Sequence, residues 1–277
     1  MKRPTSLETM TRQFVIKKAR DNDRKYDVFH PSAWGICLRK VAYQHYNYLD
    51  NFMKKADLGV DLRGERIYDN GNGAHSRWQR CLAGSGVLRG AWKCPNPLCN
   101  QVHGEEERLG IFNPLQARPG WRCPCGNDKL LDYEEVRVTS DPRYNFDGHV
   151  DAIIDVRNTE YKTGDDDLDL FVMDFKTMKS DQFVSLAKPK DEHVVQVNIY
   201  MWLLDLKSSV LAYENKDDQS LKEIYVPRDD ELIDKIKRQS EWLVEALRRR
   251  KVPMRPDGSS MSRPPCRFCE FVGLCYA

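Results

Sequence analysis

The chain has 277 residues, of which 40% are hydrophobic and 31% are charged, and its formal net charge at pH 7 is +2. A chain of this length can bury one sizeable core with a small appendage, so length alone leaves one or two domains open. No apolar run approaches the length of a membrane span, and residues 1–20 lack the apolar stretch of a secretory signal. We therefore expect a cytoplasmic protein with no signal peptide and no transmembrane segment.

The hydrophobic pattern predicts a mixed α/β (α+β) fold with a central sheet flanked by helices. We expect five segments: an N-terminal extension (1–30), an N-terminal helical part (31–86), a cysteine-bearing insert (87–131), a core of strands and helices (132–252) and a C-terminal cysteine segment (253–277).

The helical part is predicted to contain two helices. Ser32 has the side chain of an N-cap for a helix through Tyr46, and that helix would carry Cys37. A connection punctuated by glycines, residues 59–73, then leads into a helix that starts near His75 and ends near residue 84. Cys81 falls in the apolar pattern of this second helix, which predicts a packed thiol.

The insert contains two cysteine pairs, Cys94 with Cys99 and Cys123 with Cys125. They resemble the two knuckles of a zinc ribbon, although the second pair is more tightly spaced than usual, and His103 could replace one cysteine. The insert has too few apolar residues to fold alone. Zn²⁺ would therefore supply much of its folding free energy. A stabilising flap, a DNA-gripping finger and a docking surface for a partner protein all remain open as its role.

The core is predicted from period-two and continuous apolar runs followed by helical patterns. The expected strands cover residues 133–140 and 146–156, a run from Leu170 that includes Asp174, and 223–226; the expected helices cover residues 193–206 and 229–251.

Within this core, Asp174 and Lys176 are two positions apart on a strand and therefore project to the same face. If Asp151 joins them from a neighbouring strand, the site offers hard oxygen ligands for Mg²⁺ or Mn²⁺ beside a lysine. Such a site suits phosphodiester hydrolysis. Glu134 and Glu135 are further carboxylates near the entry to the strands, and either could assist a metal, although neither is assigned to the site.

Two more elements accompany this site. His75 could be a third metal ligand, and Gln196 and Tyr200 share one helical face because they are four residues apart. In chain order, these residues resemble the RecB-like branch of the PD-(D/E)xK nucleases over roughly residues 30 to 277: His75, Asp151, Asp174, Lys176, Gln196 and Tyr200.

The last segment adds a second resemblance. Cys266, Cys269 and Cys275 form a C-terminal trio, and Cys37 lies far upstream. One distant cysteine plus such a trio resembles the iron-sulfur nucleases, which include CRISPR-adaptation exonucleases, the AddB subunit and phage-encoded relatives. The resemblance implies a 4Fe-4S cluster that joins the N-terminal helix to the C-terminus. The spacing alone fits a tetrahedral Zn²⁺ equally well, so that alternative stays open.

The nuclease resemblance also implies roles. His75, Asp151, Asp174 and the backbone carbonyl of Phe175 would bind one or two Mg²⁺ or Mn²⁺ ions, Lys176 would steady the attacking water or the developing charge, and Gln196 and Tyr200 would position these groups or the DNA backbone.

The expected function is a metal-dependent DNA nuclease, an exonuclease acting on free ends or single-stranded DNA. Clusters of Lys and Arg are the expected phosphate contacts, at residues 17–25, 39–40 and 248–251. The alternatives are a catalytically idle iron-sulfur DNA-binding or assembly subunit and an RNA-processing nuclease. Proteins of recombination, repair or CRISPR adaptation are the expected partners, in the host cytoplasm if the chain is phage-encoded, and an oligomer is compatible with the resemblance.

Overall fold

The computed structural model describes residues 7–20, 24–52, 62–99, 101–103, 123, 125–126 and 131–277. Its centre is a five-stranded sheet with the strand order β1-β7-β8-β9-β10. Only β8 and β9 run parallel to each other, and the other neighbours in this sheet are antiparallel. The strands are β1 (Leu88–Arg89), β7 (Ala152–Asp155), β8 (Leu170–Met178), β9 (Ser208–Asn215) and β10 (Leu221–Pro227).

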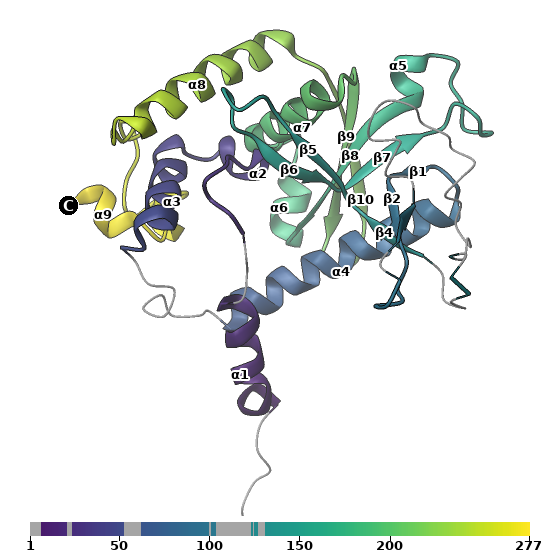
Figure 1. Cartoon of the computed structure of the whole chain (residues 1–277), viewed down its shortest axis with the longest axis horizontal. Helices are drawn as coiled ribbons and strands as arrows, with labels where there is room; N and C mark the ends of the chain where they lie inside the picture. The colour runs from purple at the N-terminus through teal and green to yellow at the C-terminus, as the bar shows by residue number, and fades with distance from the viewer. Residues whose placement is uncertain are drawn as a thin grey trace, which may run out of the picture.

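Two long helices cover the faces of this sheet (Figure 1). Helix α4 (Leu62–Gly84) packs on one face and helix α7 (Asp191–Leu204) on the other. Side chains alternate along β8, so Met173 and Phe175 enter the core beneath α4, whereas Val172 and Met178 enter the core beneath α7. The predicted central mixed sheet flanked by helices is therefore confirmed.

A second helical layer lies outside α7 and forms a third core with it. It contains α2 (Pro31–Trp34), α3 (Leu38–Asp50) and α8 (Asp230–Arg248). The chain ends here, in the short 3-10 helix η2 (Cys266–Phe268) and in α9 (Val272–Tyr276) beside α3 (Figure 1). This layer brings residues from both ends of the chain together.

Two small sheets are attached to the central one. The first has the order β3-β2-β4, from β2 (Ala91–Lys93), β3 (Val102–His103) and β4 (Asp132–Glu134). The second pairs β5 (Val136–Thr139) with β6 (Asp147–Val150). Single residues separate consecutive strands that belong to different sheets: Gly90 between β1 and β2, Glu135 between β4 and β5, and Asp151 between β6 and β7.

These single-residue junctions correct two sequence predictions. The strands expected over 133–140 and 146–156 are each interrupted, at Glu135 and at Asp151. The apolar pattern continues through both junctions, so it could not reveal that the chain changes sheets there. Gly90 allows such a change because a Cβ at this position would lie 2.3 Å from Cε2 of Tyr133.

The N-terminal helices also differ from the prediction. The helix expected from Ser32 to Tyr46 is broken: α2 starts at Pro31, with His30 as its N-cap, and ends at Trp34. A Cβ on Gly35 would lie 2.7 Å from Cα of Glu192 in α7, so this close approach requires glycine. As a result, Cys37 is the N-cap of α3 and lies just outside the helix.

Of the other predicted helices, one starts earlier than predicted and two are confirmed. Helix α4 begins at Leu62 and runs through the glycine-rich residues that were expected to be a connection. Cys81 on this helix is exposed, so the prediction of a packed thiol was wrong. The helices predicted over 193–206 and 229–251 are confirmed as α7 and α8, and the Asp229 side chain caps α8 by accepting from the Leu232 N–H at 2.9 Å.

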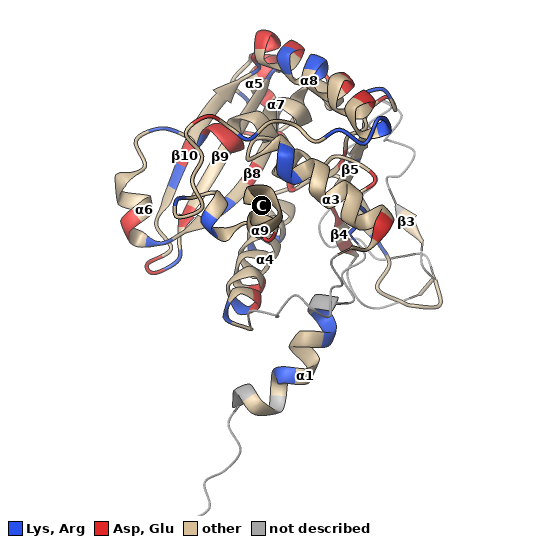
Figure 2. Cartoon of the chain, turned by 90° about the vertical axis from the view of Figure 1, so that its left-hand side faces the viewer, with Lys and Arg blue, Asp and Glu red and all other residues tan. Residues whose placement is uncertain are grey.

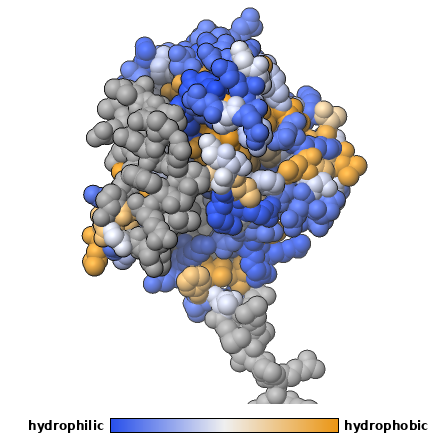
Figure 3. Space-filling view, turned by 90° about the vertical axis from the view of Figure 1, so that its right-hand side faces the viewer, coloured by the Kyte–Doolittle hydropathy of each residue, from blue (hydrophilic) through white to orange (hydrophobic). Residues whose placement is uncertain are grey.

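The remaining elements complete the surface. Helix α1 (Leu7–Arg20) projects from the body and contacts α4, with Lys18 Nζ 2.5 Å from Asp69 Oδ1; the short helices α5 (Asp166–Asp169) and α6 (Ser180–Ser185) flank β8. Acidic and basic residues are interspersed along α8 (Figure 2), and the face in Figure 3 is largely hydrophilic where the residues are described. None of the described helices combines the length and apolar character needed to cross a membrane.

Candidate active site

Asp174 and Lys176 lie side by side on β8, as period-two alternation predicts. Lys176 Nζ is 2.5 Å from Asp174 Oδ2, and the Asp174 side chain is completely buried. The other carboxylate oxygen, Oδ1, accepts a hydrogen bond from Gln196 Nε2 of α7 at 2.9 Å. Both oxygens of Asp174 are therefore engaged by residues of the chain.

Asp151 and His75 complete the centre from two other elements. Asp151 Oδ2 accepts a 2.8 Å hydrogen bond from the backbone N–H of Phe175 and lies 3.5 Å from Nδ1 of His75 on α4. The rings of His75 and Phe175 have their centroids 5.8 Å apart. The structure thus brings His75, Asp151, Asp174 and the Phe175 backbone together around the end of the small β5–β6 sheet.

Gln196 and Tyr200 face this centre from α7. Besides holding Asp174, Gln196 Nε2 lies 3.4 Å from the Tyr200 hydroxyl, which donates to the His149 carbonyl at 2.8 Å. A Cβ on Gly148 would lie 2.9 Å from Cδ of Pro31 and 3.3 Å from Cε1 of Tyr200, so glycine leaves room for both neighbours. In this arrangement Gln196 and Tyr200 position the carboxylate and the strand that precedes Asp151.

Burial and mutual contacts shift the pKa values of the central groups. Burial raises the pKa of Asp174 to about 6, and the nearby Asp151 adds to this while Lys176 opposes it. Burial would lower the pKa values of His75 and Lys176, but the carboxylates Asp151 and Asp174 outweigh it and raise both. Lys176 therefore stays charged at neutral pH.

These shifts predict that a divalent cation placed at this centre would bind more weakly in acid. His75 and Asp174 must both lose a proton to become ligands, and both raised pKa values mean that the protons are held at higher pH. We expect Mn²⁺ affinity to fall between pH 7 and pH 5 by about tenfold per pH unit for each proton displaced. Titration of Mn²⁺ at several pH values checks this, and an affinity that is constant over this range would contradict it.

The same shift has an opposite consequence for the metal-free fold. Because the pKa of Asp174 is raised from 3.8 to about 6, protonation is favoured in the folded state. The stabilisation of the folded state by protonated Asp174 is fully present below pH 4, and it is lost as the pH rises through about 6.

Three neighbours of the centre were not predicted as site residues. Glu135 and Gln79 lie beside Asp151, and Gln79 Nε2 donates both to Glu135 Oε1 at 3.0 Å and to the Asp151 carbonyl at 2.9 Å. Gln79 is four residues after His75, so helical spacing could have identified it. His193, one turn before Gln196, has its pKa lowered to about 3 by burial and by Lys176, and its Nδ1 is 2.9 Å from the Tyr213 hydroxyl.

The four insert cysteines converge on one point. Cys94 and Cys125 have their sulfurs 3.7 Å apart, Cys99 and Cys123 have theirs 3.6 Å apart, and all four sulfurs lie within 4.8 Å of one another. Four thiolates around a tetrahedral zinc at about 2.3 Å have sulfur separations of about 3.8 Å. The donor set and its spacing therefore fit Zn²⁺. The side chain of His103 lies outside the described residues.

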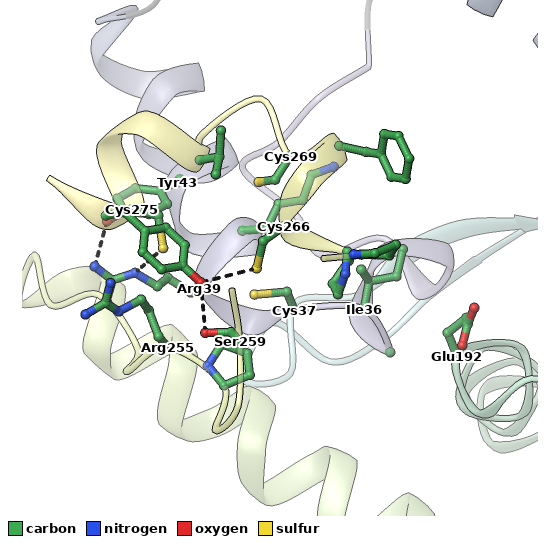
Figure 4. Close-up of a pocket in the computed structure, with 18 residues that line it drawn as sticks. Ile36, Cys37, Arg39, Tyr43, Glu192, Arg255, Ser259, Cys266, Cys269 and Cys275 are labelled. Atoms are coloured by element: carbon green, nitrogen blue, oxygen red, sulfur yellow. Dashed lines mark hydrogen bonds between the residues drawn. The ribbon is translucent and has the colours of Figure 1, made fainter. Parts of the chain in front are cut away.

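The second cysteine quartet lines a cavity of about 540 Å³ between α2, α3 and the C-terminal segment. Figure 4 shows the Cys37, Cys266 and Cys269 side chains directed toward a common space. Cys275 lies next to Arg39, whose Nε donates to its Sγ at 3.2 Å. The sulfurs of this quartet are farther apart than those of the insert quartet, since they do not all lie within 4.8 Å of one another.

Most of the basic clusters expected to contact phosphate are engaged within the chain. Arg39 also donates to the Pro253 carbonyl, Arg249 pairs with Glu245, and Arg250 pairs with Asp50. The four basic residues at the end of α8 thus face two carboxylates, Glu245 and Asp50, and a net positive charge remains there.

Comparison with known proteins places these features in a family. No curated protein matches the sequence, whereas the profile described as the PD-(D/E)XK nuclease superfamily matches residues 108–276.

Solved structures with a similar arrangement have low sequence identity. SSO0001 shares 16% identity at a TM-score of 0.48, with 99% of this chain and 97% of that chain covered. LHK-Exo, an alkaline exonuclease from Laribacter hongkongensis, solved in complex with dAMP, shares 13% identity at a TM-score of 0.41, with 87% and 94% covered. A phage related exonuclease from Haemophilus somnus 129PT shares 18% identity at a TM-score of 0.31, with 42% and 60% covered. Since the matched profile spans more than half of the sequence, this chain belongs to the PD-(D/E)XK nuclease superfamily.

Proposed function

We propose that this chain is a DNA nuclease that uses Mg²⁺ or Mn²⁺ and acts as an exonuclease on free or single-stranded ends. The observation that carries the proposal is the Asp174–Lys176 ion pair, joined in one buried centre by Asp151 and His75. A catalytically idle subunit would have no need to keep a lysine and three potential metal ligands together in a buried site. The preference for ends rests on the resemblance to iron-sulfur exonucleases.

The donor set fits a hard divalent cation with some borderline character. Two carboxylates and a backbone carbonyl are ligands that Mg²⁺ and Mn²⁺ prefer, and one imidazole is tolerated by Mn²⁺. We assign the cation to His75, Asp151, Asp174 and the Phe175 carbonyl. When bound, it would lower the pKa of a coordinated water and stabilise charge on the phosphate.

The protein's own residues would then do the following. Lys176, kept charged by Asp174 and Asp151, stabilises negative charge that develops at the phosphate or on the attacking water. Gln196 fixes the orientation of Asp174 through its 2.9 Å hydrogen bond. Tyr200 holds the β6 strand, and with it Asp151, through the His149 carbonyl.

Digestion of end-labelled DNA tests this function directly. Protein purified without oxygen is incubated with Mg²⁺ or Mn²⁺ and with linear single strands, linear duplexes, closed circles or RNA. The proposal expects degradation of linear DNA and resistance of closed circles, and the position of the label gives the polarity. Cleavage of circles would indicate an endonuclease, preferential cleavage of RNA would favour RNA processing, and no cleavage would favour a binding subunit.

We further propose that Cys37, Cys266, Cys269 and Cys275 hold a 4Fe-4S cluster. The wide spacing of their sulfurs supports this, because the four thiolates of such a cluster bind four different iron atoms rather than one ion. The cavity that they line leaves room for the inorganic core. Eight of the nine cysteines fall into two metal-type quartets, which supports a reducing cytoplasmic setting, with recombination, repair or CRISPR-adaptation proteins as partners.

For the insert we propose one structural Zn²⁺ on Cys94, Cys99, Cys123 and Cys125. We expect Cys94→Ser to lose about one zinc per chain and to lower the melting temperature by several degrees, since Cys94 is also part of a hydrophobic core. Elemental analysis and thermal melting measure both effects. Cys81→Ser is the matched control, because Cys81 is exposed and outside both quartets. Equal zinc contents in the two variants would contradict the proposal.

A further inference from the structure

Glu135 occupies a special place in the strand register. The β5–β6 ladder pairs Val136 with Val150 at its end, so one step further the register sets Glu135 opposite Asp151. The β7–β8 ladder pairs Ala152 with Met173, so one step further sets Asp151 opposite Asp174. Three carboxylates therefore occupy consecutive cross-strand positions at the point where the sheets meet. Like charges directly opposite each other on strands are destabilising unless something neutralises them.

Among the described residues, a cationic side chain pairs with Asp174 at one end of this row, whereas none pairs with Glu135 at the other end. Asp174 pairs with Lys176 at 2.5 Å. Among the residues that the structure describes, neither Lys nor Arg forms an ion pair with Glu135. Its hydrogen bond there comes from the neutral amide of Gln79, which also holds the Asp151 carbonyl and so fixes Glu135 relative to Asp151.

The ligand atoms that could bind a cation lie at the Glu135 end of this row of carboxylates. Each oxygen of Asp174 has one partner in the chain, and Phe175 donates to one oxygen of Asp151, so each of these carboxylates keeps lone pairs for a cation. One ligand atom from each of His75, Glu135 and Asp151 lies within 4.8 Å of the others. Ligands at about 2.1 Å from an octahedral cation lie about 3 to 4.2 Å from one another, so small side-chain rotations suffice to bring these three onto one ion.

We propose that Glu135 is a direct ligand of a divalent cation held together with His75 and Asp151, and that Gln79 positions Glu135 for this role. The inference deepens the proposed nuclease function, on which it rests, by adding a carboxylate from the junction between β4 and β5. The site takes Mn²⁺ or Mg²⁺, and the carboxylate of Glu135 adds a negative charge that favours a doubly charged ion.

The proposal is tested by measuring Mn²⁺ binding in the absence of DNA. The electron paramagnetic resonance signal of free Mn²⁺ reports how much of the ion remains unbound. We expect Glu135→Gln to weaken Mn²⁺ binding by at least about tenfold, while Glu134→Gln stays within about twofold. Glu134 is the matched control because it is the adjacent carboxylate and alternation along the strand turns it to the other face. Gln79→Ala should show a smaller loss, as expected for a positioning residue.

Thermal melting separates this role from a purely structural one. Without a cation, Glu135→Gln should melt at the same or a higher temperature than the wild type, since it removes repulsion from Asp151. With saturating Mn²⁺, the wild type should gain more than the variant. Unchanged Mn²⁺ affinity, or a lower melting temperature without cation together with unchanged affinity, would overturn the proposal.

Neither readout depends on cleavage, so the two proposals can fail separately. If the wild type cleaves DNA while Glu135→Gln binds Mn²⁺ normally, the nuclease stands and the assignment of Glu135 fails. If Mn²⁺ binding depends on Glu135 but DNA is not cleaved, the ligand assignment stands and the nuclease fails. Should Glu135→Gln not fold, Glu135→Asp keeps the charge with a shorter reach, and an unchanged affinity in that variant would count against the proposal.

Discussion

Replacing Lys176 by alanine should reduce cleavage by at least about a thousandfold while leaving the protein folded and able to bind DNA. The ammonium group is the one cationic side chain paired with Asp174 in the described part of the centre, and it lies at the place where charge would develop during hydrolysis. Its loss removes an interaction that is strongest in the transition state, so the turnover number should fall far more than the affinity for DNA.

Single-turnover cleavage and DNA binding in Ca²⁺ measure the two effects separately. Lys179→Ala is a suitable control, because Lys179 follows β8 directly and lies outside the centre. Lys176→Arg keeps the charge but changes its geometry, so partial recovery is expected only if charge is the main contribution. Equal losses of binding and cleavage in Lys176→Ala would contradict a role in chemistry.

Replacing Cys37 by serine should have the largest effect on stability. Cys37 lies at the start of α3, and its three partners are within the last twelve residues of the chain, so a shared cluster closes a loop of more than two hundred residues. A cross-link over such a loop is worth about 5 kcal/mol in the chain-entropy account, which is a large part of the stability of an ordinary domain. We expect loss of the brown colour, loss of iron and a large decrease in melting temperature.

Asp174→Ala provides the contrast to the cysteine variant. It should give a folded, brown and inactive protein, because Asp174 belongs to the centre and not to the cysteine cavity. Cys81→Ser again controls for the loss of any thiol. If Cys37→Ser and Asp174→Ala unfold equally, the division into a structural and a catalytic site is wrong; if zinc is found in place of iron, the cross-link stands and the cluster does not.

Local periodicity predicted two pairs of side chains near the centre, and the nuclease resemblance was needed to place the pairs in one site. Asp174 and Lys176 share a face because side chains alternate along any strand, and Gln196 and Tyr200 share a face because they are four residues apart on a helix. The structure brings both pairs together, and it confirms the mixed sheet between helices.

The sequence did not reveal features that depend on contacts between distant segments. Position 35, the C-cap of α2, requires glycine because the backbone of Glu192 approaches it, and this neighbour is more than 150 positions away in the chain. Helix α4 includes four glycines, since packing on the sheet outweighs their low helix propensity. The sequence named Glu134 and Glu135 equally as carboxylates that could assist a metal, and the register of β5 and β6 was needed to tell them apart.

The single-residue junctions on both sides of the zinc-type insert have a mechanical consequence. Gly90 and Glu135 are each the only residue between a strand of the β3-β2-β4 sheet and a strand of another sheet. Consecutive Cα atoms are 3.8 Å apart, so neither junction offers a length of chain that could serve as a hinge. A large movement of the small sheet would therefore require the backbone angles of Gly90 and Glu135 to change together. Each junction therefore ties the position of the small sheet closely to the strand on its other side.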